Sequence, residues 1–264
     1  MSKDYILNFI AQTDFESHVT DTLRQYNKSL KAINLEKFND NFIDPIKLLF
    51  DKNVFAKSFE EIINLEIHRQ RDKSNNNIIG YFHQNIFKHI KSCCVPDKKW
   101  DVIFTSAKKT YYIEMKNKHN TMNSSSSTNT FLTMQNHLLN AKDKERSVCA
   151  LVEIIAKKSQ DIPWVISIDG NKQKANNNLR RISIDKFYEI VTNKKDSFKC
   201  LCWQLPITIE KIISSKKHLQ AENDTVIEEL ANINKNTLFA LYKIAFSTYE
   251  GFDFFSNNNF DIYK

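Results

Sequence analysis

The hydrophobic pattern of this chain changes from helical spacing to strict alternation and back again. Residues 100–118 (WDVIFTSAKKTYYIEMKNK) alternate apolar and polar positions, and they predict a hairpin with strands over residues 101–105 and 110–116. Before it, apolar positions three and four apart predict helices over residues 15–33, 45–55, 58–71 and 78–91, with a break at 75–77. After it we expect a polar loop over 117–129, strands over 148–156, 163–168 and 181–184, and helices over 130–141, 184–192, 198–216 and 224–248.

The register of the predicted hairpin brings two carboxyl groups together. If the turn centres on Ala107 and Lys108, Asp101 lies directly opposite Glu114. Lys116 shares a face with Glu114, because side chains two residues apart on a strand point the same way. Mg²⁺ prefers carboxylate oxygens, and a nearby lysine can hold the attacking water or stabilise charge that develops on a phosphodiester. The hairpin therefore suits a divalent metal beside a phosphate.

The spacing D-x(12)-E-x-K is the signature of the PD-(D/E)xK nuclease superfamily, although charged residues recur in most hairpins. Pro96 and Asp97 supply a second candidate for the acidic position. Pairing Asp97 with Glu114 would shorten the apolar strand, and Pro, Asp and Lys are typical of turns. We therefore assign the first carboxylate to Asp101.

Length and composition narrow the class of protein. With 264 residues and 41% hydrophobic content, we expect a single nuclease domain over residues 1–264, with a helical N-terminal part (1–57), a catalytic core (58–205) and a helical C-terminal part (206–264). No apolar run approaches the ~20 residues of a membrane span and no signal peptide is visible, so we expect a cytoplasmic protein. The three glycines are too scattered for a Walker loop or a dinucleotide cradle.

Positive charge is concentrated around the hairpin. The chain carries 38 Lys and Arg against 31 Asp and Glu, a net charge of +7. Residues 98–200 hold 19 basic and 10 acidic residues, a surplus of nine, whereas the rest of the chain has a small acidic excess. Lys-rich loops are often merely solvated, but a surplus beside the hairpin is what a polyanion partner requires.

Long segments then resemble type II restriction endonucleases of the group that cuts GG-N-CC sites. They are IEMKNKHNTMNSSSSTNTFLTMQNHL (113–138), IGYFHQNIFKHI (79–90), LVEIIAKKSQDIPWVISIDG (151–170) and RRISIDKFYEIVT (180–192), within a likeness that spans residues 58–205. The resemblance implies an α/β fold with the restriction-endonuclease-like core, a mixed β-sheet flanked by helices, and helical N- and C-terminal extensions. It also implies Mg²⁺ dependence and double-strand cleavage at a GGNCC-like palindrome. Asp101, Glu114 and Lys116 take the family's metal-ligand and catalytic-lysine positions, with the Met115 carbonyl as a further ligand.

Other residues have two readings each. Glu66 lies on a predicted helix before the sheet, where a carboxylate can assist the metal site or simply face solvent. Gln135 can orient a water or a phosphate, or it is an exposed amide. For DNA contact the loop after the catalytic strand and the basic pairs supply donors to phosphates or base edges. The candidates are Asn117, Lys118, His119, Asn120, Asn123, Ser124, Ser125, Lys157, Lys158, Arg180 and Arg181.

The partners follow from the resemblance and from the symmetry of such a target. Double-stranded DNA is the expected substrate, and a near-palindromic site is most simply read by a homodimer with one active site per strand. A cognate DNA methyltransferase is expected in the same host, without a stable complex. The alternatives are a repair or structure-specific nuclease on the same fold, and a non-catalytic DNA-binding protein. The intact acidic triad argues against the last, because two carboxylates repel DNA unless a cation intervenes.

Overall fold

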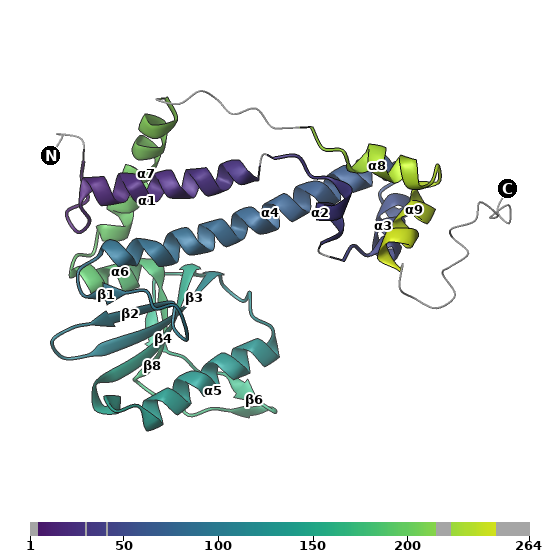
Figure 1. Ribbon diagram of the computed structural model, residues 1–264. Helices are drawn as coiled ribbons and strands as arrows, with labels where there is room; N and C mark the ends of the chain where they lie inside the picture. The colour runs from purple at the N-terminus through teal and green to yellow at the C-terminus, as the bar shows by residue number, and fades with distance from the viewer. Residues whose placement is uncertain (1–4, 30, 41, 215–222, 247–264) are drawn as a thin grey trace. The chain divides into compact units, whose positions relative to one another are not determined.

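The computed structural model describes residues 5–29, 31–40, 42–214 and 223–246, and the chain divides into two compact units (Figure 1). The first unit comprises Met1–Arg24 and Ile78–Lys217, and the second comprises Gln25–Asn77 and His218–Lys264. The boundary falls inside the helices α1 (Gln12–Lys28) and α4 (Phe59–Asn85). The expectation of a single nuclease domain over the whole chain stays a prediction.

A six-stranded mixed sheet forms the centre of the first unit, in the strand order β1-β2-β3-β4-β8-β5. The strands β3, β4 and β8 run parallel to one another, while β1 and β2 pair antiparallel on one side and β5 on the other. Their bounds are Cys93–Cys94 (β1), Val102–Thr105 (β2), Thr110–Lys118 (β3), Ser147–Ile155 (β4), Asp161–Pro163 (β5) and Leu179–Ser183 (β8). A two-stranded ribbon of β6 (Ser167–Ile168) and β7 (Asn171–Lys172) lies apart from this sheet.

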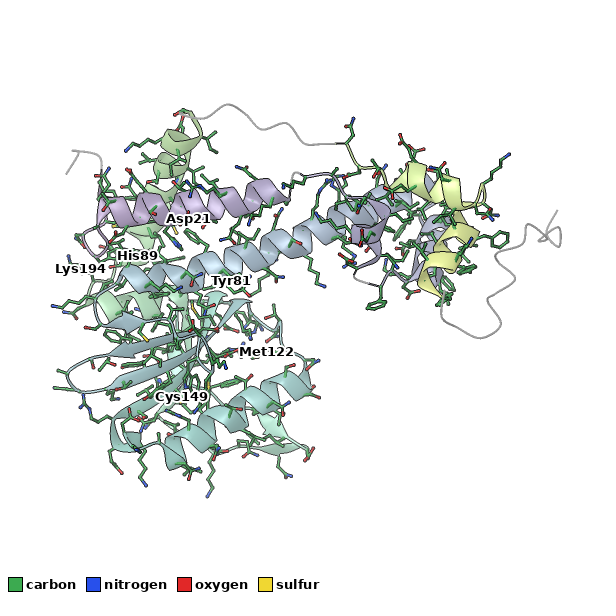
Figure 2. The ribbon with its side chains drawn as sticks, viewed as in Figure 1. Asp21, Tyr81, His89, Met122, Cys149 and Lys194 are labelled. Atoms are coloured by element: carbon green, nitrogen blue, oxygen red, sulfur yellow. The ribbon has the colours of Figure 1, made fainter. Side chains whose placement is uncertain are left out.

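Helices cover the sheet on both faces. On one face, α5 (Ser124–Asn140) packs Phe131 and Met134 against Cys149 of β4, which lies on the α5 side of the sheet in Figure 2. On the other face, α6 (Ile184–Thr192) and α7 (Ser197–Ser214) share a core with Ala150 and Val152 of β4. Residues 147–154 of β4 are therefore all buried, which explains their nearly continuous apolar sequence. The predicted fold, a mixed β-sheet flanked by helices, is confirmed.

The second unit is helical. It contains α2 (Leu35–Asn39), α3 (Pro45–Val54), the first part of α4, α8 (Val226–Ile233) and α9 (Thr237–Ala245). Its core packs Phe38 and Ile63 with Val226 and Leu241, each at most 1% exposed. The carboxylate of Asp224 ties distant segments together, since it accepts hydrogen bonds from Arg71 and from the Ile33 amide.

Two predictions around the hairpin are wrong. The helix does not break at residues 75–77, because α4 continues to Asn85 and ends in the 3₁₀ turn Ile86–His89. Asparagine inside a helix costs only a few tenths of a kcal/mol, which packing overrides. The loop expected over 117–129 is shorter, because β3 extends to Lys118 and α5 begins at Ser124. The Asn123 side chain accepts a hydrogen bond from the Ser126 amide at 2.8 Å and so caps a serine-rich first turn.

Two other elements that were expected to be continuous are each interrupted in the structure. The strand expected over 163–168 is wrong, because β5 ends at Pro163 and β6 begins only at Ser167. The helix expected over 224–248 is two helices, since α8 ends before Asn234 and the Asn236 side chain caps α9. Its last two residues, and residues 215–216 of the helix expected over 198–216, lie outside the described residues. Over the described part of the chain, no helix is both long and apolar enough to cross a membrane.

Candidate active site

The β2–β3 hairpin has the register that the sequence predicts. Val102 pairs with Ile113, so Asp101, one residue before β2, stands opposite Glu114. The Asp101 amide donates to the Ile113 carbonyl at 2.9 Å, which extends the ladder to the carboxylate itself. The cross-strand placement of the two acids is therefore confirmed.

Asp101 is held from two sides. Its Oδ2 accepts a hydrogen bond from the Met115 amide at 2.7 Å, and its carbonyl accepts one from Gln84 of α4 at 3.2 Å. Burial raises the pKa of Asp101 above its ordinary value, and the charge of Glu114 adds to the rise, while the Met115 amide and Lys116 act against it. The site thus holds a carboxylate whose charge a nearby cation would stabilise.

Glu114 and Lys116 project from the same face of β3 and form an ion pair. Lys116 Nζ lies 2.7 Å from Glu114 Oε1, and the two side chains keep 31% and 25% of their surface exposed. Within the described residues, Asp101 Oδ1 and Glu114 Oε2 accept no hydrogen bond, and no cluster of three His, Cys, Asp or Glu side chains is placed to hold a metal. Two carboxylates are nevertheless a common protein contribution to Mg²⁺, with carbonyl, water and phosphate oxygens as the remaining ligands.

The sheet register continues this face onto the parallel strands. Glu114 pairs with Leu151 of β4, and Leu151 pairs with Arg181 of β8, so a row across the sheet joins the carboxylates to an arginine. Arg181 lies two strands from Glu114, roughly 10 Å away by the usual strand spacing. In the next row, Lys116 pairs with Glu153. Acids of the hairpin and a cation of β8 therefore share one face.

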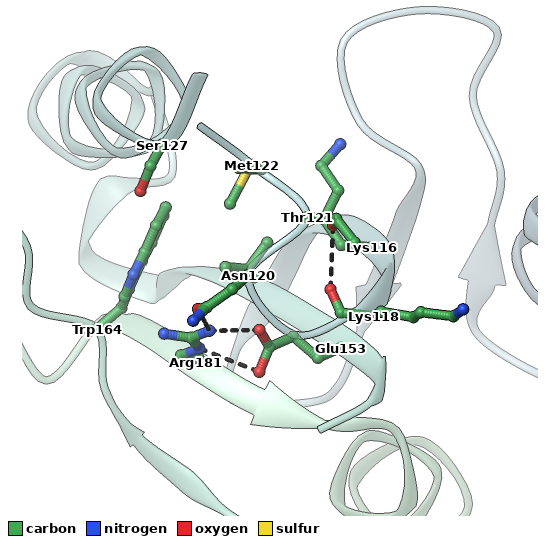
Figure 3. A pocket seen from close by; sticks show the side chains of 10 residues that line it. Lys116, Lys118, Asn120, Thr121, Met122, Ser127, Glu153, Trp164 and Arg181 are labelled. Atoms are coloured by element: carbon green, nitrogen blue, oxygen red, sulfur yellow. Dashed lines mark hydrogen bonds and ion pairs between the residues drawn. The ribbon is translucent and has the colours of Figure 1, made fainter. Parts of the chain in front are cut away.

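Glu153 anchors a compact charged network beside Lys116 (Figure 3). Its side chain is 2% exposed, and its carboxylate accepts hydrogen bonds from Arg181 Nε at 3.0 Å and from Arg181 Nη2. His119 Nδ1 lies 3.0 Å from Glu153 Oε1 and 2.6 Å from Arg181 Nη2. Burial favours a higher pKa for Glu153, but the hydrogen bonds of Arg181 and His119 outweigh it and hold the pKa below its ordinary value. Glu153 is therefore a buried carboxylate that stays charged.

A small open pocket, with a volume of about 50 Å³, lies over this network, and we refer to it as the Arg181 pocket. Its polar wall includes Lys116, Lys118, Asn120, Ser127, Glu153 and Arg181, which come from β3, the turn after it, α5, β4 and β8. Leu151 and Trp164 contribute apolar surface below. Three cationic side chains around one buried carboxylate make the pocket suited to an anion.

The remaining DNA-contact candidates are spread over several surfaces. The side chain of Asn117 lies against Gly80 of α4, on the opposite face of β3 from Lys116. Asn123 caps α5, and Ser124 and Ser125 are exposed in its first turn. Lys157 and Lys158 are exposed between β4 and β5. Arg180 points away from Arg181 and binds Asp161 through Nε at 2.8 Å. The structure thus brings Lys118, His119, Asn120 and Arg181 together.

The two residues expected near the metal ligands have different surroundings. Glu66 belongs to the second unit, where its nearly buried carboxylate accepts hydrogen bonds from Arg69 Nε at 2.6 Å and from Gln70 at 3.1 Å. Gln135 is partly buried on α5. Their assistance to the metal site stays a prediction.

Glu153 was not among the site residues predicted from the sequence. The sequence does mark this position, because Glu153 is the one acidic residue within the apolar strand SVCALVEII. A charged side chain in a strand that is covered on both faces is expected to bind an oppositely charged side chain or a metal ion. The identity of the partner strand was not visible in the sequence.

A mixed six-stranded sheet flanked by helices, with two acids on its antiparallel hairpin, is consistent with the restriction-endonuclease-like fold. The model of the family described as Eco47II restriction endonuclease matches residues 7–214 of the chain. The protein belongs to this family and is a type II site-specific deoxyribonuclease.

Two relatives support the assignment. Type II restriction enzyme Sau96I from Staphylococcus aureus is 28% identical over 250 residues, which cover 86% of this chain and 95% of the relative. Type II restriction enzyme Eco47II from Escherichia coli is 29% identical over 216 residues, which cover 80% of this chain and 90% of the relative. Both alignments extend well beyond the hairpin, so the likeness concerns the whole nuclease and not one motif.

Proposed function

We propose that this enzyme makes Mg²⁺-dependent double-strand cuts in DNA at a GGNCC-like palindromic site. The observation that carries the proposal is the convergence of Asp101, Glu114 and Lys116 on one face of the hairpin. The target sequence rests on the resemblance of residues 113–138 and their flanking segments to enzymes that cut GG-N-CC sites.

Asp101 and Glu114 would hold the metal, with the Met115 carbonyl as a further ligand. The two side chains suit Mg²⁺ as oxygen ligands, because each carboxylate keeps one oxygen without a hydrogen bond among the described residues. When bound there, Mg²⁺ lowers the pKa of a coordinated water and neutralises charge on the phosphodiester.

Lys116 would act on the reacting groups directly. Its ammonium has three hydrogens and one carboxylate partner, Glu114 Oε1, so donors remain for the attacking water or a phosphate oxygen. A lysine at this place holds the water in line with the scissile bond and stabilises negative charge in the transition state. Attack on phosphorus leaves a 5′-phosphate and a 3′-hydroxyl.

A two-fold symmetric target requires two active sites, and each chain has one such hairpin. We propose a cytoplasmic homodimer that cuts one strand with each subunit, and a methyltransferase in the same host that protects its sites without a stable complex. Sedimentation of the protein alone and with a duplex carrying one site tests the stoichiometry. A single chain per duplex at all concentrations contradicts the dimer.

The activity is tested by digesting unmethylated phage DNA with Mg²⁺ and sequencing the fragment ends. Lys116→Ala removes the proposed catalytic ammonium, and Lys109→Ala is the matched control, because Lys109 is exposed at the far end of the same hairpin. We expect discrete fragments with common ends from the wild type and the control, and a loss of at least about 100-fold in rate for Lys116→Ala.

Each alternative predicts a distinct digestion pattern. A smear without common ends would indicate a non-specific or repair nuclease. Tight binding without cleavage by the wild type would indicate a non-catalytic DNA-binding protein. Common ends at an unrelated sequence would refute the GGNCC-like target and leave the cleavage chemistry intact.

A further inference from the structure

The guanidinium of Arg181 is already committed on two of its nitrogens. Nε, which has one hydrogen, donates to Glu153 Oε2 at 3.0 Å. Nη2, which has two, donates to Glu153 Oε1 and to Asn120 Oδ1, the latter at 3.5 Å. Among the described residues only Nη1 has no close partner. Arg181 therefore keeps a single nitrogen for a ligand.

This arrangement argues against base reading by Arg181. Recognition of guanine by arginine uses two nitrogens of the fork, one for O6 and one for N7. Such a fork is not available, because Glu153 takes Nε and one hydrogen of Nη2, and the second hydrogen of Nη2 is bound to Asn120 Oδ1 at 3.5 Å. A single nitrogen is sufficient to contact a phosphate oxygen. The ion pair is 22% exposed on the arginine and 2% on the glutamate, so it is too well buried to be exchanged freely for DNA.

The turn after the catalytic strand is fixed to the same carboxylate. The His119 amide donates to the Ile155 carbonyl at 2.9 Å, and the His119 ring contacts Glu153. Asn120 then adopts a left-handed conformation, with φ of 55°, and its Oδ1 lies 3.5 Å from Arg181 Nη2. Glu153 thus joins β4, β8 and the end of β3 at one point.

The Arg181 pocket borders the catalytic lysine. Lys116 forms part of its wall and is the register partner of Glu153. Lys118, two residues further along β3, projects from the same face and is exposed. A DNA strand whose scissile phosphate lies at Lys116 has further phosphates on either side, and the cations of the pocket suit one of them.

We propose that Glu153 is a positioning residue which holds Arg181 Nη1 against a non-scissile phosphate of the strand being cut, with Lys118 as a second contact. The inference rests on the proposed DNA cleavage, and it deepens that function by assigning Arg181 to the phosphate backbone. The guanines are then read by other residues, and Glu153 acts through Arg181 without touching the DNA.

The decisive variant is Glu153→Gln, because charge alone and positioning predict different results. The substitution removes a negative charge from the wall of the pocket, so simple electrostatics predicts tighter DNA binding and no loss of activity. If Glu153 positions Arg181, we expect kcat to fall about 10- to 100-fold with a smaller change in KM, since a misplacement of about 1 Å has such effects. Arg181→Gln should match this loss, and the Glu153→Gln/Arg181→Gln double variant should be no worse than Arg181→Gln alone. Lys109→Gln, with the same loss of one charge away from the pocket, is the control for Arg181→Gln.

DNA binding without cleavage separates this inference from the proposed function. Binding to plain duplex DNA is measured over a range of salt with Ca²⁺ in place of Mg²⁺. We expect the slope of log K against log salt to fall by about one for Arg181→Gln and for Glu153→Gln. If the wild type binds but does not cut and these slopes still fall, the phosphate contact stands and the proposed activity fails. If the wild type cuts and the slopes are unchanged, only the phosphate contact is refuted.

The remaining outcomes also test whether Glu153 positions Arg181. Glu153→Gln leaves Arg181 unpaired and can fail to fold, which a circular dichroism melt reveals. The double variant, which removes both charges, then carries the test through its salt slope. Wild-type kcat in Glu153→Gln, additive losses in the double variant, or relaxed preference for guanine in Arg181→Gln would each overturn the proposal.

Discussion

The assignment of the first metal ligand is tested most sharply by Asp101→Asn. The amide keeps an oxygen that can accept the 2.7 Å hydrogen bond from the Met115 amide, so the hairpin should persist. Only the charge is lost. Because burial raises the pKa of Asp101, the metal-free fold should be at least as stable with the neutral residue. Cleavage should fall by at least about 1000-fold, since one of two carboxylate ligands is missing.

The magnitude of metal stabilisation follows from linkage. At Mg²⁺ about 100 times its Kd, binding adds about 2.7 kcal/mol to the free energy of unfolding. If the substitution weakens Mg²⁺ about 100-fold, the same concentration adds only about 0.4 kcal/mol. A domain of this size gains roughly 2–4 °C in Tm per kcal/mol, so we expect a rise of roughly 5–10 °C for the wild type and about 1 °C for the variant.

The assay is a pair of thermal melts, in EDTA and in Mg²⁺, followed by circular dichroism beside the cleavage rate. Asp97→Asn is the matched control, because Asp97 is the other acid of this sequence that fits the motif and is exposed before β2. We expect it to keep both the Mg²⁺ shift and the activity. An undiminished shift in Asp101→Asn, or a lost shift in Asp97→Asn, would refute the assignment.

Three further predictions concern stability. Burial lowers the pKa of His83 to about 4, so below the unfolded pKa of about 6.5 the unfolded state binds more protons than the folded state. The free energy of unfolding should therefore fall by up to about 1.4 kcal/mol per pH unit down to about pH 4. Urea unfolding should show a shallower decline with pH for His83→Gln. Asn123→Ala should cost about 1 kcal/mol and raise amide exchange of residues 124–127 about fivefold, while Asn123→Ser should not. Arg71→Met should cost about 2 kcal/mol in the unfolding of the second unit, because its bidentate bond to Asp224 is about four-fifths buried; an unchanged urea midpoint would contradict this.

The hairpin was predictable because local rules determine it. Alternation sets which residues share a face, and a symmetric turn sets the register, so the position of Asp101 opposite Glu114 follows without knowledge of any other strand. The same alternation also places Arg180 and Arg181, both candidates for DNA contact, on opposite faces of β8. What a strand pattern lacks is the order of strands in the sheet.

That missing order is why the Glu153 network was not predicted. Glu153 and Arg181 are 28 residues apart, and they meet only because β8 returns beside β4 in parallel. The chain between them forms β5 and the β6–β7 ribbon, and short elements of this kind do not reveal which neighbour they pair with. The predicted break at residues 75–77 of α4 was wrong for a different reason. Three asparagines have a low helix propensity, but this small cost is overridden by packing.

The distribution of charge over this face also bears on how DNA is accepted. Asp101 and Glu114 alone would repel a phosphodiester, and Lys116 offsets only one of them. Arg181 does not supply the missing charge, because Glu153 already balances it. These five side chains are therefore net negative until a divalent cation binds, whereas Lys118 and the exposed lysines between β4 and β5 are positive with or without the metal. We expect DNA to associate with the enzyme through those lysines in the absence of metal, and a phosphate to reach the two carboxylates only when a cation is bound. Association and cleavage would then depend on different side chains, the first on these lysines and the second on Asp101, Glu114 and Lys116.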